Sequence, residues 1–171
     1  MQDKTMQQLL RLVMTGVLMA LACVATMVIQ IPSPTHGYMN LGDCVVLLSG
    51  CLLGPVYGAV AGGVGSALAD LLSGYAVYVP GTLVIKAVMA ALAGTLYRRS
   101  RKLLPVGAVL AELVMIVGYW LYDGFLMGSL AGSAAGIPSN IIQGVFGGVC
   151  GVALVAALSR VPQIRKWFPG L

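Results

Sequence analysis

Residues 41–72 read LGDCVVLLSGCLLGPVYGAVAGGVGSALADLL, an almost unbroken apolar run with a single Gly-Pro step inside it. As one helix this run would be about 48 Å long at 1.5 Å per residue, well beyond the roughly 30 Å hydrocarbon core of a bilayer. Proline removes a helical hydrogen bond and clashes with the preceding turn, so we expect a break at Gly54-Pro55. The run therefore predicts two membrane helices, 41–53 and 56–72.

The rest of the chain shows the same pattern of apolar segments separated by loops. Proline and glycine mark a loop at 32–38, and we expect further loops at 75–81 and 124–138. The sequence predicts an all-α integral membrane protein with one transmembrane domain, 1–171. Its six helices are expected at 9–31, 41–53, 56–72, 82–97, 103–122 and 139–158.

The composition agrees with a membrane protein. Hydrophobic residues make up 59% of the chain and charged residues 9%, against roughly 25% charged residues in a soluble domain. Six crossings leave no room for a separate soluble catalytic domain. The formal charge of +5 does not indicate nucleic-acid binding, because the basic residues lie at the ends of apolar segments and not on a polar surface.

Lysine and arginine predict the orientation, since cytoplasmic loops carry the excess of both. With six helices and a cytoplasmic N-terminus, these residues face the cytoplasm: Lys4, Arg11, Arg98, Arg99, Arg101, Lys102, Arg160, Arg165 and Lys166. Only Lys86 is left, inside a predicted helix. If 41–72 were one helix, the clusters at 98–102 and at the C-terminus would lie outside. The bias therefore favours six helices with both termini in the cytoplasm.

Neither a metal nor a cofactor is expected. The cysteines are scattered through apolar stretches without a CxxC pair and are interpreted as small core residues: Cys23, Cys44, Cys51 and Cys150. His36 has no second histidine or cysteine near it, which argues against a metal site.

Ionisable side chains inside predicted helices mark candidate binding positions, because such groups are costly in a membrane. Asp70 and Lys86 lie near the outer ends of their helices, where they are expected to form an ion pair with each other or to contact a ligand. Glu112 lies deeper in its helix, and a helix-packing hydrogen bond made by its neutral form would explain it equally well. Asp43, in the first turn of 41–53, complements the helix dipole.

Two polar stripes begin at the outer surface. They follow the three- and four-residue steps of a helical face and comprise Glu112, Met115, Tyr119, Tyr122 and Asp123 on one helix and Asn140, Gln143 and Gly147 on the next. Tyr38 and Asn40, in the loop before 41–53, are placed to close over a bound ligand. The stripes and this loop predict a binding pocket near the outer face.

Small residues recur at four-residue spacing in 41–72, and again at Gly16 and Ala20 in the first helix. Such stripes let helix backbones approach closely. They are explained either by packing inside the protein or by a docking face for another membrane protein.

Three short runs occur in a distinctive order: GYMNLGD at 37–43, LGPVYGA at 53–59 and GSALADLLSGY at 65–75. In these runs, in length and in helix content, the chain resembles the substrate-binding S components of energy-coupling factor (ECF) vitamin transporters. The similarity covers nearly the whole chain in topology and residues 37–90 in motif.

The resemblance implies a multi-pass protein of the bacterial plasma membrane that captures a vitamin-like heterocycle of the pyridoxine, thiamine pyrimidine or riboflavin class. Tyrosines, Trp120 and amide side chains suit a flat ring. The expected substrate-binding residues are Tyr38, Asn40, Asp70, Tyr75, Lys86, Glu112, Tyr119, Tyr122, Asp123, Asn140 and Gln143.

The resemblance also implies partners, namely a membrane coupling (T) subunit and two cytoplasmic ATPase subunits. Small residues of the first helix, Gly16, Ala20 and Ala22, would face the coupling subunit. The chain has no Walker motif, so the partners would hydrolyse ATP and this chain is not expected to be an enzyme. It lacks the Met-His start of nickel and cobalt members, which argues against a metal substrate.

Two other classes of protein agree less well with the sequence. A stand-alone secondary carrier often shows inverted repeats, and no convincing repeat relates the two halves of this chain. Tyr122-Asp123 and Leu41-Gly42-Asp43 are similar to the paired motifs of intramembrane aspartyl proteases, but the order is reversed and the second glycine is missing.

Overall fold

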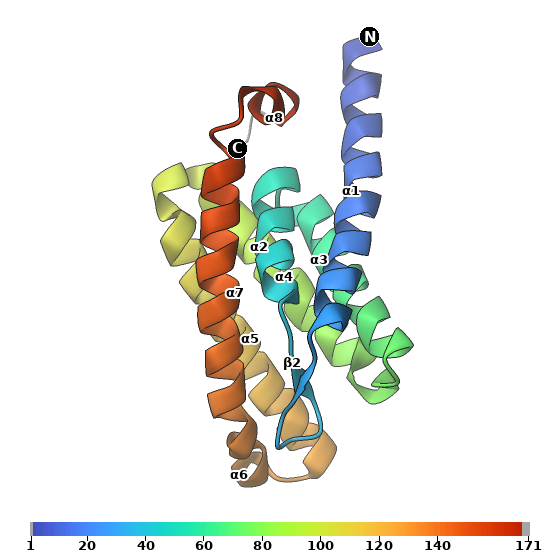
Figure 1. The fold of residues 1–171 in the computed structure, drawn as a ribbon, viewed down its shortest axis with the longest axis vertical. Helices are drawn as coiled ribbons and strands as arrows, with labels where there is room; N and C mark the ends of the chain where they lie inside the picture. The colour runs from blue at the N-terminus through green and yellow to red at the C-terminus, as the bar shows by residue number, and fades with distance from the viewer. Residues whose placement is uncertain (1, 169–171) are drawn as a thin grey trace.

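In the computed structural model, which describes residues 2–168, helices pack side by side and a short β-hairpin lies at one end of the bundle (Figure 1). The longest elements are α1 (Gln2–Val28), α3 (Pro55–Leu72), α4 (Val79–Arg99), α5 (Leu104–Met127) and α7 (Ile137–Leu158). The shorter helices are α2 (Gly42–Leu53), α6 (Leu130–Ser133) and α8 (Pro162–Trp167). Strands β1 (Ile31–Pro32) and β2 (Tyr38–Met39) pair antiparallel, and 3-10 turns lie at Ala76–Tyr78, Arg101–Leu103 and Ala134–Gly136.

The apolar helices confirm the all-α membrane class. Within residues 2–168, five segments are long and apolar enough to cross a membrane: Thr5–Val28, Pro55–Leu72, Ala76–Arg99, Arg101–Met127 and Leu130–Leu158. Helix α2 is apolar but has 12 residues, about 18 Å of helix. It contacts α1, α3, α4 and α7, and eleven of its residues are buried. Other helices of the protein therefore surround α2. In Figure 1, β2 lies directly beyond the start of α2, at the end of the bundle that carries the hairpin.

The predicted break between α2 and α3 lies at Gly54-Pro55. Gly54 has a φ of 86°, a conformation that glycine adopts without steric cost. Pro55 then starts α3, where its missing N–H is not needed. The Arg98 guanidinium, at the end of α4, donates a hydrogen bond to the Leu53 carbonyl oxygen at 2.9 Å and occupies the space where a side chain at Gly54 would lie.

Several helix boundaries differ from those expected. Helix α1 ends at Val28, not at Ile31, because Ile31 and Pro32 turn away to pair with β2. The segments expected as loops at 75–81 and 124–138 are mostly helical. Prolines there begin α4 and α7 within their first turns, and Gly128, with a φ of 63°, ends α5.

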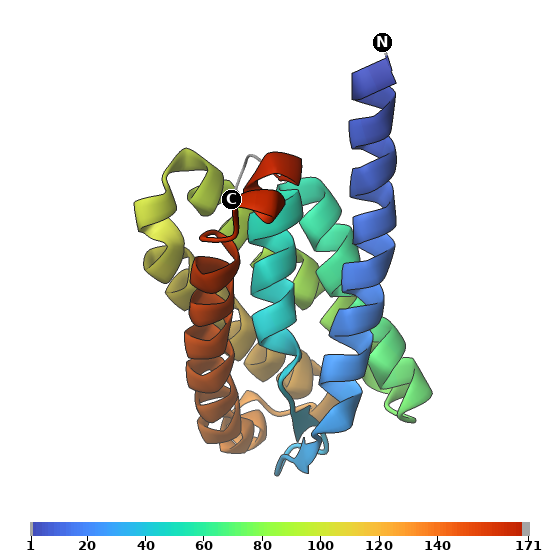
Figure 2. The ribbon, with the colours of Figure 1, turned by 45° about the horizontal axis from the view of Figure 1, so that its top comes forward.

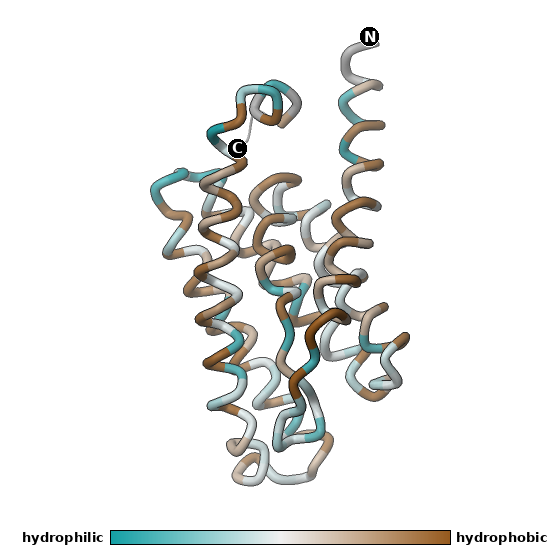
Figure 3. The backbone as a smooth tube through the Cα atoms, in the orientation of Figure 1, coloured by the Kyte–Doolittle hydropathy of each residue, from teal (hydrophilic) through white to brown (hydrophobic). Residues whose placement is uncertain are grey.

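The two ends of the bundle differ in what they carry. Figure 1 shows α8, the start of α1 and the α4–α5 connection at one end, and the β-hairpin at the opposite end. The last turn of α4 and the α4–α5 connection after it hold the exposed side chains of Arg98, Arg99, Arg101 and Lys102. Figure 3 shows hydrophilic sequence at this connection and again near the hairpin, with mainly hydrophobic helices between.

Small residues bring the central helices close together. A side chain at Gly50 would strike the Ala90 backbone of α4, and one at Gly58 would strike the Gly50 backbone of α2. The four-residue stripe of 41–72 therefore serves packing inside this chain.

Helix α1 stands at the edge of the bundle, and its first turns extend beyond the other helices (Figure 2). Gly16 and Ala20 are exposed on it. Ala22 is fully buried, against Gly65 of α3, so its expected place on the same outward face is wrong. Two residues along a helix correspond to a rotation of roughly 200°, which turns Ala22 toward the core when Ala20 faces out.

Candidate functional site

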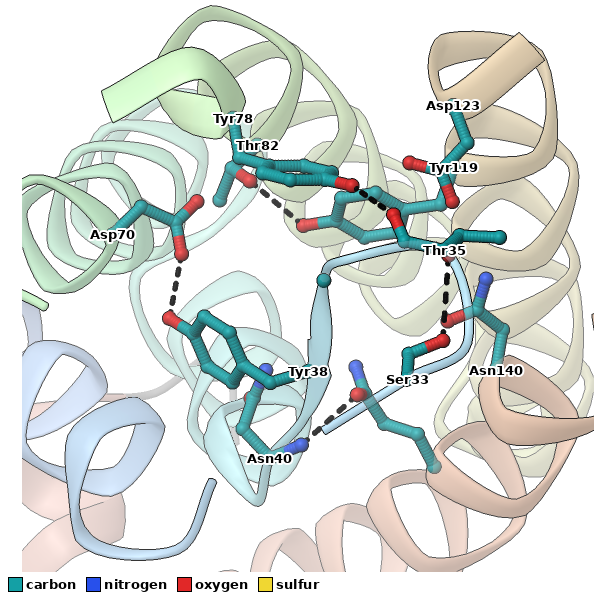
Figure 4. Close-up of a pocket in the computed structure, with 12 residues that line it drawn as sticks. Ser33, Thr35, Tyr38, Asn40, Asp70, Tyr78, Thr82, Tyr119, Asp123 and Asn140 are labelled. Carbon is teal, nitrogen blue, oxygen red and sulfur yellow. Dashed lines mark hydrogen bonds between the residues drawn. The ribbon is translucent and has the colours of Figure 1, made fainter. Parts of the chain in front are cut away.

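A polar cavity lies beneath the β-hairpin (Figure 4). Its lining comes from the hairpin segment, residues 31–40, from the 3-10 turn before α4, and from helices α3, α4, α5 and α7. The lining residues are Ser33, Thr35, Gly37, Tyr38, Asn40, Asp70, Tyr78, Thr82, Tyr119, Asp123, Asn140 and Gln143. The cavity volume is about 30 Å³, far below the roughly 300–1,000 Å³ of drug-sized pockets. The hairpin segment supplies five of the lining residues and thus covers the site.

On one side of the cavity, Tyr38 connects the hairpin to α3. Its hydroxyl donates a hydrogen bond to Asp70 Oδ1 at 2.5 Å, and its ring lies 4.6 Å from the Tyr75 ring, centroid to centroid. Burial, together with the neighbouring Asp70 carboxylate, raises the pKa of Tyr38 well above its ordinary value. Tyr38 therefore stays a neutral donor at physiological pH.

On the other side, Tyr78 and Asp123 face the hairpin. The Tyr78 hydroxyl donates to the Thr35 carbonyl oxygen at 2.7 Å. Asp123 is 3% exposed and lies beside the Thr35 and Tyr78 side chains. The Thr82 and Tyr119 hydroxyls are hydrogen-bonded at 2.9 Å, so polar groups surround the cavity from several elements.

A buried ion pair connects the site to the core. Lys86 Nζ contacts Asp43 Oδ1, and the two side chains are 2% and 0% exposed. Gln143 donates to Asp43 Oδ2 at 2.7 Å and accepts a hydrogen bond from the Asn40 backbone N–H at 3.0 Å. The expected pairing of Lys86 with Asp70 is wrong. Helix α2 contacts both α4 and α7, so its first turn brings Asp43 to Lys86 and to Gln143.

Seven of the eleven expected binding residues line the cavity: Tyr38, Asn40, Asp70, Tyr119, Asp123, Asn140 and Gln143. Tyr75 lies behind the lining, on the Tyr38 ring. The Tyr122 hydroxyl donates to the Val77 carbonyl oxygen at 2.7 Å. Lys86 Nζ lies 5.4 Å from the Tyr119 ring centroid. These three residues support the lining side chains without forming part of it.

Glu112 lies away from the cavity. Its carboxylate packs between α5 and α7, against Gly144 and Gly147, where the lack of side chains leaves room for it. Neither carboxylate oxygen has a hydrogen-bond partner among the described residues. The helix-packing hydrogen bond expected for Glu112 is therefore not formed there.

Five lining residues are not among those predicted from the sequence: Ser33, Thr35, Gly37, Tyr78 and Thr82. The first three belong to a proline-rich segment that reads as an exposed loop, and only the hairpin folds it over the cavity. A signal for the other two was present, because Tyr78, Thr82 and Lys86 follow four-residue steps and so share one helical face.

Known proteins share both the sequence pattern and the fold. The family model described as "ECF-type riboflavin transporter, S component" matches residues 6–160. A solved structure described as "Structure and mechanism of the S component of a bacterial ECF transporter" aligns with a TM-score of 0.73 at 26% identity, over 89% of this chain and 96% of that one.

A curated relative gives a shorter match. A protein of Pyrococcus woesei described as "Uncharacterized protein in gap 3'region" is 41% identical over 99 residues, which are 56% of this chain and 66% of that protein. The chain thus matches slightly less than two-thirds of that relative's length.

Proposed function

The chain belongs to the family of ECF-type riboflavin transporter S components, and on this premise we propose that the cavity beneath the hairpin captures a vitamin-like heterocycle for uptake across the cell membrane. The main support for this proposal is the cavity itself, which is a buried polar site at the hairpin end of an apolar helix bundle. Its function is binding and not catalysis, in keeping with a family of transporter subunits.

The lining suits a flat ring of the pyridoxine, thiamine pyrimidine or riboflavin class. Tyr38, Tyr78 and Tyr119 offer aromatic faces, and Asn140 and Gln143 offer amide groups. Small-molecule sites combine apolar and aromatic walls with a few placed polar groups in this way.

Ligand access requires the hairpin to move, because the cavity holds only about 30 Å³. Three contacts hold the hairpin down: Tyr38 to Asp70, the Thr35 carbonyl oxygen to Tyr78, and the Asn40 N–H to Gln143. We expect the first two to break when the hairpin lifts and to be replaced, in the closed complex, by contacts with the ligand.

The proposed topology has six crossings and cytoplasmic termini. The basic α4–α5 connection lies at the same end as the start of α1 and α8 (Figure 1), which supports a cytoplasmic position for that end under the positive-inside rule. The hairpin and cavity then face the outside. A coupling subunit would dock on the exposed side of α1 that carries Gly16 and Ala20, and two ATPase subunits would drive transport.

The test is a thermal-stability screen of the detergent-purified chain against vitamins and their precursors, with mass spectrometry of co-purified small molecules. A ligand that binds only the folded state stabilises it by mass action, by about 2.7 kcal/mol at a hundredfold excess over Kd. We expect one ring compound to stand out. If no compound stabilises the folded protein and none co-purifies, the capture function is wrong.

A further inference from the structure

The charged side chains that line the cavity are both acidic. Asp70 on α3 and Asp123 on α5 stand on opposite sides of it (Figure 4). They are 4% and 3% exposed. None of the twelve lining residues is a lysine, an arginine or a histidine.

Each of these carboxylates keeps one oxygen without a partner. Asp70 Oδ1 accepts the Tyr38 hydroxyl, but Asp70 Oδ2 has no hydrogen-bond partner among the described residues, and neither has Asp123 Oδ1. A buried acceptor without a donor is costly, and buried charges in proteins are normally paired. The cavity wall therefore presents two acceptors that a bound molecule can satisfy.

Lys86 does not supply the missing positive charge. Its ammonium group contacts Asp43, and both partners of this ion pair are buried. Because Lys86 is paired with Asp43, neither acid of the lining forms an ion pair with a described residue.

Building on the proposed function, we infer that the cavity selects heterocycles that carry a protonated nitrogen or an amino group, and discriminates against those that carry a carboxylate. N–H groups at two edges of a ring would donate to Asp70 and Asp123. An anionic ligand would meet two acidic side chains and no basic side chain in the cavity lining. A site can reject a competing ligand in this way. The tyrosine faces also favour a cation over a neutral ring.

Two matched ligand series test this selectivity by titration calorimetry at pH 7. Pyridoxamine, pyridoxine and 4-pyridoxic acid share one ring and differ in an amine, an alcohol or a carboxylate. The second series pairs 4-amino-5-hydroxymethyl-2-methylpyrimidine with its 4-hydroxy counterpart, and riboflavin serves as a larger neutral ligand. In the series that binds, we expect the amino compound to bind roughly 10- to 100-fold more tightly than its hydroxyl counterpart, and the carboxylate to bind most weakly.

Isosteric variants locate the effect. Asp70→Asn and Asp123→Asn should each weaken the amino ligand by about tenfold or more while changing the hydroxyl counterpart by less than about threefold. Glu112→Gln is the matched control, because it neutralises a buried acid on the same helix as Asp123 but outside the cavity. It should leave both affinities unchanged. If an Asn variant does not fold, the relative affinities of the amino, hydroxyl and carboxylate ligands for the unaltered chain still test the inferred selectivity.

The outcomes separate this inference from the proposed function. If riboflavin, a hydroxyl compound or a carboxylate binds most tightly, and Tyr119→Ala weakens it, the cavity captures a vitamin but the inferred selectivity is wrong. If the amino ligand leads and the Asn variants bind it as tightly as the parent chain, the assignment to Asp70 and Asp123 is wrong. If none of these compounds binds the folded chain, the result contradicts the proposed function and this inference with it.

Discussion

At the scale of single residues, the chain concentrates its costly polar groups around the hairpin end. Two acids line the cavity, and a lysine and a third acid form a buried pair next to it. Such groups are rare inside membrane helices and mark functional positions. Which acid pairs with which base depends on helix packing: Asp43 and Lys86 are 43 positions apart, so sequence spacing could not predict their contact.

The buried pair should behave as a coupled unit. Lys86→Met leaves the Asp43 carboxylate buried without its counter-charge, and we expect a loss of about 3–5 kcal/mol in the free energy of unfolding. Adding Asp43→Asn should restore part of that loss, because the uncompensated charge is removed. Chemical denaturation of the two single variants and the double variant measures this. Strictly additive losses would contradict the coupling.

Tyr38→Phe should loosen the hairpin. The change removes the hydroxyl that donates to Asp70 and leaves a buried carboxylate oxygen without a donor, at an expected cost of about 1–3 kcal/mol. Hydrogen exchange should show faster exchange at 31–40. Tyr57→Phe, on the exposed side of α3, is the control and should leave the hairpin unchanged. Equal exchange in both variants would show that Tyr38 does not hold the hairpin.

At the scale of elements, α2 and the hairpin determine where the site lies. The α2–α3 break is predictable from Gly54-Pro55 because proline acts locally. The hairpin is not predictable, since two-residue strands are too short to show the alternation that identifies a strand. For the same reason the sequence does not identify Ser33 and Thr35 as binding residues. It does identify the helical residues of the lining from their position along a helix and the face they share: Asp70, Tyr119, Asp123 and Asn140.

The Gly54 turn provides a matched comparison with Gly74. Both glycines have a positive φ, 86° and 85°, but a side chain would strike Arg98 at Gly54 and meet open space at Gly74. Alanine should cost about 1–2 kcal/mol of stability at Gly74 from backbone strain alone, and more at Gly54. Thermal unfolding compares the two. Equal losses at the two positions would contradict the extra cost expected at Gly54.

At the scale of the whole molecule, the structure is polar and basic at one end and holds its cavity at the other (Figures 1 and 3). The orientation can be tested by cysteine labelling of intact cells, in a chain whose four native cysteines are replaced by alanine. A membrane-impermeant maleimide should label Ala131→Cys, on α6 near the hairpin, and should label Ser100→Cys, in the α4–α5 connection, only after lysis. The reverse pattern would place the cavity in the cytoplasm.

Capture of the transported molecule in this cavity can be tested by measuring how tightly the best ligand from the stability screen binds to a cavity variant. Tyr119→Ala, Asp123→Ala and Asn140→Ala together remove lining groups from two helices. We expect at least a hundredfold loss of affinity, about 2.7 kcal/mol, in a chain that remains folded. Unchanged affinity in that folded variant would place the binding site elsewhere in the protein.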